Sequence, residues 1–159
     1  LPFIRGLNTK GAAEVCKAIN SVLSQINKVF GNEKVVRVHS DRGKEFVNKL
    51  LKDGLAENQI YQSVTQGYDP RSTGLAERFV GILKQRATSY LVHSGLSVRF
   101  WYWAALQASY VYRCRLLGVK LPDNSPTFGH RVRVRFVAGE KEHVARSRRR
   151  QLFWLGASL

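Results

Sequence analysis

The chain has 159 residues, enough for one domain with a core of its own and room for an appendage. A hydrophobic content of 44% excludes a disordered chain. Lysine and arginine number 26 against 11 acidic residues, a net charge of +15. This excess predicts a polyanionic partner: nucleic acid first, with an anionic membrane surface as the alternative. No apolar run is long enough to span a bilayer, so no membrane partner is expected.

The first thirty residues predict a strand and a helix. Residues 1–7 have the character of a brief strand. Thr9 is the candidate cap of a helix over residues 12–30, where apolar side chains recur every three or four positions before a Gly-Asn pair. Cys16 lies in this pattern and Cys114 in a later one. Both are expected to be core thiols in a reducing compartment, with a disulfide or metal pair as the alternative.

The next segment predicts two strands joined by a helix. β-branched residues make 35–39 a strand that ends shortly before Asp41, so an acid is expected at the carboxyl edge of a strand. Apolar residues predict a helix over 46–55 and a second strand over 60–65. Residues 66–74 then contain two glycines and a proline, which predicts a loop.

A long helix is predicted to follow, with Glu77 in its first turn and its end near His93. At about 100° per residue, one side of this helix is apolar and should face the core; it consists of Leu75, Phe79, Ile82, Leu83 and Tyr90. The opposite side carries Glu77, Gly81, Lys84 and Thr88. Lys84 is therefore either a contact to a DNA phosphate or an ordinary solvated lysine. Arg86 falls within the apolar side, and the pattern does not account for it.

A fourth helix is predicted over residues 97–117, capped by Ser97 and apolar nearly all round. Its aromatic residues favour packing in the core or between subunits, with stacking on bases as the alternative. A turn-rich connector over 121–129 follows. We therefore predict two domains, a core over residues 1–118 and a connector with a basic extension over 119–159.

The extension is predicted to form a basic β-hairpin-like structure. Residues 131–137 alternate strictly between apolar and cationic side chains, residues 138–141 read as a turn, and a basic run follows. The candidate contacts to a DNA backbone are Arg131, Arg133, Arg135, Arg146, Arg148, Arg149 and Arg150. A solvated face and a nuclear-import signal are the alternatives.

Two blocks carry a resemblance to a known family. Residues 39–46 read His-Ser-Asp-Arg-Gly-Lys-Glu-Phe, and residues 68–78 read Tyr-Asp-Pro-Arg-Ser-Thr-Gly-Leu-Ala-Glu-Arg. They resemble the second and third acidic motifs of retroviral-type integrases, in the variant found in the Pol polyprotein of copia-type LTR retrotransposons. Residues 121–129 resemble the proline motif that follows the core in these integrases. The resemblance spans roughly residues 1–130 and implies an α/β, RNase H-like fold.

The resemblance also implies a reaction, the joining of element DNA to target DNA by two-metal phosphoryl transfer. Asp41 would bridge two Mg²⁺ (or Mn²⁺) ions and Glu77 would bind one of them. Lys84 matches a DNA-contacting lysine of the family, and Arg71 and Arg78 of the second block are further candidate DNA contacts. The expected partners are DNA and further copies of the chain in a homo-oligomer, and the expected location is the nucleus.

The first catalytic carboxylate of the family has no counterpart here. It lies on the first strand of that fold, upstream of the part that resembles residues 1–10, and the sequence has no aspartate before Asp41. Glu14, inside a helix, and Glu33, in a turn, do not fit its role. We therefore expect an N-terminally truncated fold with an exposed edge on the 35–39 strand, inactive alone and better at binding DNA than at cutting it. The alternatives are a non-enzymatic DNA-binding or assembly module derived from an integrase, and an unrelated basic protein.

Overall fold

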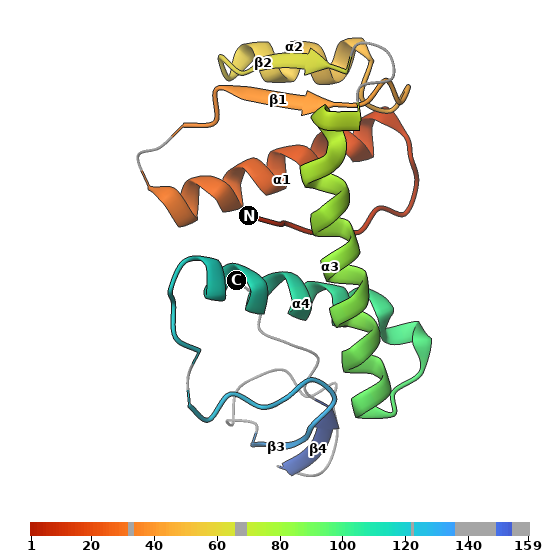
Figure 1. The fold of residues 1–159 in the computed structure, drawn as a ribbon, viewed down its shortest axis with the longest axis vertical. Helices are drawn as coiled ribbons and strands as arrows, with labels where there is room; N and C mark the ends of the chain where they lie inside the picture. Colours follow the sequence, from red (N-terminus) through yellow and green to blue (C-terminus); the bar gives the residue numbers. More distant parts are fainter. Residues whose placement is uncertain (32–33, 66–69, 122, 136–148, 154–159) are drawn as a thin grey trace. The chain divides into compact units, whose positions relative to one another are not determined.

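A computed structural model of the chain describes residues 1–31, 34–65, 70–121, 123–135 and 149–153, with residues 70–73, 133–135 and 149–153 described by their backbone alone (Figure 1). The chain forms two compact units. One is Phe3–Phe79, and the other joins Leu1–Pro2 to Val80–Leu159. The predicted boundary at residue 118, between a core and a basic extension, is a different division and stays a prediction.

Helix α1, Ala12–Phe30, begins with a carboxylate that reaches back to the preceding loop. Glu14 accepts hydrogen bonds from the backbone N–H groups of Asn8 at 2.6 Å and Thr9 at 2.8 Å, and from the Thr9 hydroxyl at 2.6 Å. The N-cap residue is Gly11, with no side-chain cap, so the prediction that Thr9 caps the helix is wrong. Thr9 acts through Glu14 instead, because an acid at the third helical position can satisfy amides before the helix.

These bonds make the start of α1 sensitive to acid. They lower the pKa of Glu14 from its usual value of 4.5, and the Thr9 hydroxyl contributes most. A carboxyl whose pKa is lower in the folded state stabilises that state above the unfolded pKa, and this stabilisation is lost as the pH falls through the folded pKa. We expect the thermal midpoint to fall more below about pH 4 in the parent chain than in Glu14→Gln. A Glu57→Gln variant, changed at an exposed glutamate, is the control; equal acid sensitivity of Glu14→Gln and the parent would contradict the prediction.

A strand–helix–strand segment follows, as predicted. Strand β1 is Arg37–Ser40, helix α2 is Lys49–Glu57 and strand β2 is Tyr61–Val64. The strands pair in parallel with Arg37 opposite Tyr61, and α2 forms the crossover between them. The Asn48 side chain caps α2 by accepting a hydrogen bond from the Leu51 N–H at 2.9 Å. The predicted boundaries differ from these by one to three residues.

The core of the Phe3–Phe79 unit lies between α1, α2 and the strands. Its buried side chains include Val15, Leu51 and Leu55, each no more than 2% exposed. Helix α2 lies close to α1 at Gly54, where a Cβ would make an ordinary van der Waals contact with the Cys16 sulfur at 3.7 Å. Both cysteines are free thiols; Cys16 is half-buried and Cys114 is buried.

Helix α3, Pro70–Ser94, begins earlier than the sequence predicts. The sequence favours a loop over 66–74 with Glu77 in the first helical turn, but Pro70 is the first residue of the helix and Glu77 lies two turns inside it. The fixed φ of proline suits the first helical position, where its missing N–H costs nothing. Residues 66–69 lie outside the described part of the chain. The helix ends before Gly95, whose φ of 64° permits the reversal.

The two sides of α3 differ as predicted, with one exception. Leu83 is buried, and Phe79, Ile82 and Tyr90 are half-buried. Leu75, however, is 65% exposed, so it does not belong to the core side. Arg86 is now accounted for, because its guanidinium lies 5.0 Å from the centre of the Tyr112 ring in a cation–π contact.

The 3₁₀ turn η1, Val98–Phe100, leads into helix α4, Trp101–Leu116. The Ser97 hydroxyl accepts a hydrogen bond from the Arg99 N–H at 3.4 Å, so Ser97 caps this turn. The N-cap of α4 is Phe100, with no side-chain cap, so Ser97 does not cap the helix itself as the sequence predicted. Small residues form the buried side of α4: Ala104, Ala105 and Ala108. The aromatic residues Trp101, Tyr102 and Trp103 remain 37%, 37% and 46% exposed, so core packing is the wrong prediction for them; a subunit interface stays a prediction.

The N-terminal residues are held by side chains, not by a sheet. Residues 1–11, all described, contain no strand, so the predicted strand over 1–7 is wrong. The carbonyl of Pro2 accepts hydrogen bonds from the Ser109 hydroxyl at 2.8 Å and from Arg113 Nη1 at 2.9 Å. Arg113 also donates to the Ser109 hydroxyl at 2.7 Å, and burial lowers the pKa of this guanidinium.

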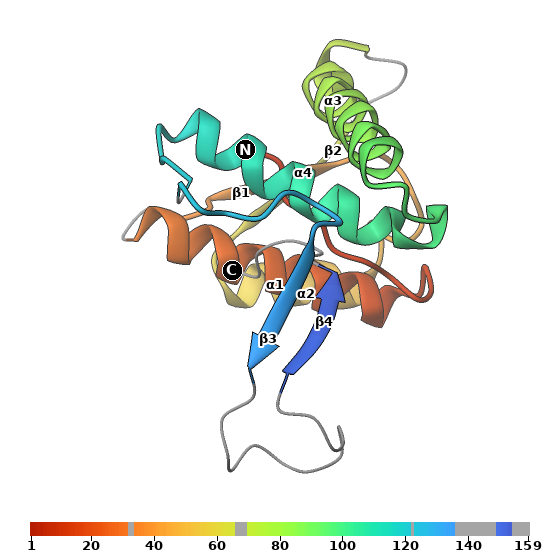
Figure 2. The ribbon, with the colours of Figure 1, turned by 90° about the horizontal axis from the view of Figure 1, so that it is seen from below.

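The extension forms the predicted antiparallel pair. Strand β3, Arg131–Arg135, runs beside strand β4, Arg149–Phe153, as Figure 2 shows. The predicted turn over 138–141 lies outside the described residues, as do Arg146 and Arg148. Among the described helices, none combines the length and the apolar character needed to cross a membrane.

Candidate metal and DNA site

Asp41 directly follows strand β1, at the strand's carboxyl end, as the sequence predicts. Its side chain is exposed, and Oδ1 accepts a hydrogen bond from the Gly43 N–H at 3.0 Å. A carboxylate that bonds an amide two residues on forms an Asx turn, which fixes the rotamer of the acid. The second carboxylate oxygen, Oδ2, is the one that this turn leaves available to a ligand.

Gly43 lets a second carboxylate approach the same turn. A Cβ on Gly43 would lie 2.8 Å from Glu45 Oε2 and 3.1 Å from Asp41 Oδ1, so a larger residue would displace the Glu45 carboxylate from this position. Sequence reasoning assigned no role to Glu45. The sequence feature that could have identified Glu45 is its position four residues after Asp41, with a glycine between them. A compact turn over these residues brings the two carboxylates close together. The turn therefore gathers two acidic side chains around one small residue.

The backbone on both sides of Asp41 is bound to the end of β2. The Thr65 N–H donates to the Ser40 carbonyl at 3.0 Å, and Arg42 Nε donates to the Thr65 carbonyl at 3.0 Å. Thr65 is itself buried. The residues before and after Asp41 thus share one anchor, so the position of the carboxylate depends on the end of a neighbouring strand.

His39 joins the same two strands and is engaged at both ring nitrogens. Nδ1 lies 2.9 Å from the Ser63 hydroxyl, and Nε2 lies 3.2 Å from the Thr65 hydroxyl. Each hydroxyl can donate or accept, so either neutral tautomer of the ring is satisfied. The ring therefore cross-links β1 to β2 and is not presented as a metal ligand.

Glu77 lies on the exposed side of α3, in the same compact unit as Asp41. Gly81, Lys84 and Thr88 are exposed as well, which confirms the predicted polar side of the helix. Shared coordination of metal ions by Asp41 and Glu77 stays a prediction. Within the described ranges, no three His, Cys, Asp or Glu side chains gather closely enough to hold a metal ion.

The structure describes the side chains of some of the predicted DNA contacts and only the backbone of others. Arg78 and Arg131 have exposed side chains. Others lie in segments described by their backbone alone, namely Arg71, Arg133, Arg135, Arg149 and Arg150. The register of the hairpin sets Arg135 opposite Arg149 and Arg133 opposite Gln151. Opposite residues of an antiparallel pair share one face, so the positions of Arg131, Arg133, Arg135 and Arg149 lie on one side of the ribbon. The position of Arg150, opposite Val134, lies on the other side.

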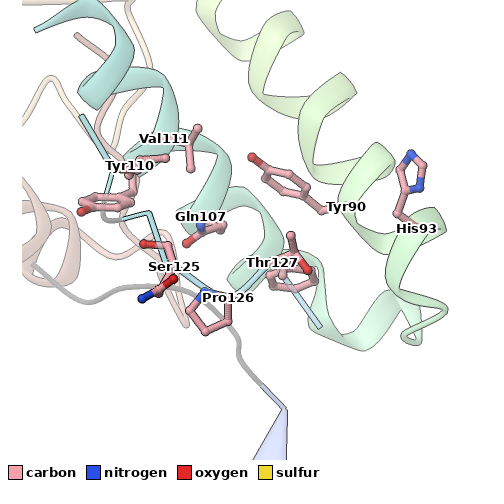
Figure 3. A pocket seen from close by; sticks show the side chains of 11 residues that line it. Tyr90, His93, Gln107, Tyr110, Val111, Ser125, Pro126 and Thr127 are labelled. Atoms are coloured by element: carbon pink, nitrogen blue, oxygen red, sulfur yellow. The ribbon is translucent and has the colours of Figure 1, made fainter. Parts of the chain in front are cut away.

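A separate hollow of about 860 Å³ lies among α3, α4, Leu121 and residues 124–128, and includes none of the predicted catalytic residues (Figure 3). The rings of Tyr90 and Phe128 stack beside it with their centres 5.9 Å apart. Burial raises the pKa of Tyr90, an effect larger than the opposing one from Arg86. This hollow reflects how the proline-containing connector packs on the two helices.

Solved structures with a similar fold include retroviral integrases. The catalytic core domain of BIV integrase matches with a TM-score of 0.51 and 21% identity over 65% of this chain and 61% of that chain. The simian T-cell lymphotropic virus intasome in complex with PP2A regulatory subunit B56 gamma matches with a TM-score of 0.54 and 17% identity over 87% of this chain and 52% of that chain. The chain therefore has the RNase H-like α/β fold of integrase cores.

A third structure, the HTLV-2 integrase catalytic core domain in complex with magnesium, has 23% identity over 62% of this chain and 57% of that chain. Its TM-score of 0.43 is too low to add to the fold assignment. The chain spans between about half and three fifths of the length of these matched chains. No protein-family model matches the sequence.

Proposed function

We propose that the chain is part of a copia-type integrase, a polynucleotidyl transferase that joins element DNA to target DNA. The observation that carries the proposal is the placement of Asp41. An exposed carboxylate stands at the carboxyl end of strand β1, in a glycine turn braced from β2, on a fold shared with retroviral integrase cores. The two motif blocks around Asp41 and Glu77 support the copia-type assignment.

The donor set suits the metal that this reaction uses. Carboxylate oxygens are the ligands that Mg²⁺ and Mn²⁺ prefer, and Asp41 and Glu77 would hold the ions. When bound, the ions would supply Lewis-acid stabilisation of a phosphodiester under attack. The Gly43 N–H orients the Asp41 carboxylate, and Arg42 fixes its backbone through Thr65. Lys84 and Arg78, both exposed on α3, would bind DNA phosphates.

The chain supplies two of the three carboxylates that the resemblance requires. We therefore propose that it binds DNA but does not transfer strands alone, and that it acts in the nucleus within a homo-oligomer. The excess of 26 basic over 11 acidic residues supports DNA as the partner.

The test compares an Asp41→Asn/Glu77→Gln variant with an Asp53→Asn/Glu57→Gln variant. Both remove one aspartate and one glutamate charge, and Asp53 and Glu57 are exposed residues of α2. In a titration with Mn²⁺ followed by NMR, we expect paramagnetic broadening around residues 41–45 and 77 in the parent and the control, and its loss in the first variant. Mn²⁺-dependent strand transfer is measured in parallel. Broadening that persists in the first variant would refute the metal site, and strand transfer by the parent would refute inactivity.

A non-enzymatic DNA-binding module is the second candidate, and the cationic side of the β3–β4 hairpin favours it. Under this function, the variant lacking Asp41 and Glu77 would bind duplex DNA as tightly as the parent does. Replacing Arg131, Arg133 and Arg135 by alanine would weaken binding and lower the slope of log K against log salt by about one for each DNA phosphate that the variant no longer neutralises.

A further inference from the structure

A second surface of the Phe3–Phe79 unit contains a groove beside a strand edge. A groove of about 520 Å³ lies between helix α2 and the edge of strand β2 that faces away from β1. These two elements pack against each other and are drawn together in Figure 1. The Gln62 side-chain amide donates to the Phe46 carbonyl at 2.8 Å and holds the segment before α2 against the strand.

The edge of β2 offers free main-chain groups to this groove. Hydrogen bonds from the Tyr61 N–H to Val36 and from the Thr65 N–H to Ser40 point toward β1. Because successive residues of a strand alternate in direction, the main-chain groups of Gln62 and Val64 point the other way. Both residues line the groove, and within the described part of the chain their main-chain N–H and C=O groups have no hydrogen-bond partner.

The lining of the groove is apolar with a cationic rim. Val47 and Tyr61 contribute apolar surface and are 53% and 68% exposed. Lys49 and Lys52, both exposed on α2, supply the charge, and no acidic residue lines the groove among the described residues. Such a surface complements a ligand that carries carboxylates and apolar side chains together.

We propose that this groove binds an extended acidic peptide segment, which adds to β2 as a further strand. Its backbone pairs with Gln62 and Val64, its apolar side chains fill the groove, and its carboxylates meet Lys49 and Lys52. Duplex DNA fits less well, because phosphates gain nothing from an apolar lining and only two cations flank it. This inference does not depend on the proposed integrase function.

The charge requirement is tested by fluorescence anisotropy with a labelled peptide, acetyl-Thr-Glu-Thr-Val-Thr-Glu-Thr-Val-Thr-amide, and its Glu-to-Lys counterpart. We expect the acidic peptide to bind, the basic one not to bind, and Lys49→Glu/Lys52→Glu to weaken binding about tenfold or more. The control is Lys10→Glu/Lys28→Glu, the same charge change at two exposed lysines outside the groove. Circular dichroism of both variants checks that they fold.

Strand addition is tested with two N-methylated forms of the acidic peptide, one methylated at the threonines and the other at the glutamates and valines. A paired strand uses only alternate amides toward its neighbour, so one form should lose binding and the other should retain it. Equal effects of the two methylations, equal weakening by both lysine pairs, binding of the basic peptide, absence of binding by the acidic one, or its displacement by duplex DNA would each overturn the proposal.

Discussion

Replacing Leu51 by alanine is expected to lower the free energy of unfolding of the Phe3–Phe79 unit by about 3 kcal/mol. Leu51 is 1% exposed, so truncating its side chain removes buried apolar surface and leaves a cavity that the packed helices can fill only in part. The adjacent Leu50 is 51% exposed on the same helix, and Leu50→Ala should change stability by about 0.5 kcal/mol or less.

The stability of the Leu51→Ala and Leu50→Ala variants is best measured by amide hydrogen exchange of residues 37–64. The three tryptophans of the sequence, Trp101, Trp103 and Trp154, all fall outside residues 3–79, whereas exchange of these amides reports on the unit directly. A similar loss for Leu50→Ala and Leu51→Ala would contradict the burial of Leu51. The result bears on the candidate site, since α2 packs on β2 and the end of β2 anchors the backbone around Asp41.

Gly129→Ala should destabilise the unit that contains α4 by about 3 kcal/mol. Gly129 has a φ of 78°, which an alanine adopts only with strain, and a Cβ there would overlap the Ser94 side chain at the end of α3. The neighbouring Phe128 is 6% exposed and stacks on the half-buried Tyr90, so the backbone cannot shift without disturbing this ring contact.

Gly118→Ala is the matched control for this substitution. Gly118 has a similar φ of 66°, but a Cβ there would meet nothing within 4 Å. Only the cost of the left-handed backbone should remain, about 1 kcal/mol. Urea denaturation followed by tryptophan fluorescence measures both variants. If the two losses were the same, the contact between Gly129 and Ser94 would not limit the packing of the connector.

Local patterns in the sequence were sufficient to predict most of the helices and strands. Three- and four-residue apolar spacing predicted α1, β-branched residues predicted β1, apolar residues predicted α2 and β2, and alternation predicted β3. The position of Asp41 at the end of a strand followed from the same patterns. Periodicity also identified the exposed side of α3 with Glu77 and Lys84, because a regular helix converts spacing directly into direction.

The sequence-based predictions were wrong where the same local residues are compatible with two different structures. Glycine and proline in residues 66–74 suggested a loop, yet proline also suits the first position of a helix, and α3 begins at Pro70. The apolar character of residues 1–7 suggested a strand, but the carbonyl of Pro2 is satisfied by Ser109 and Arg113, more than a hundred residues away. Short segments carry too little pattern to decide between such alternatives.

The sequence by itself determined which residues carry acid and cation chemistry and on which elements they stand. Only the tertiary structure decided how that chemistry is held. The brace from Arg42 and Thr65, the His39 cross-link, the approach of Glu45 to Asp41 across Gly43 and the open edge of β2 all join residues through contacts between elements or within an irregular turn. Composition and periodicity describe one element at a time, whereas these contacts exist only once β1, α2 and β2 have packed together.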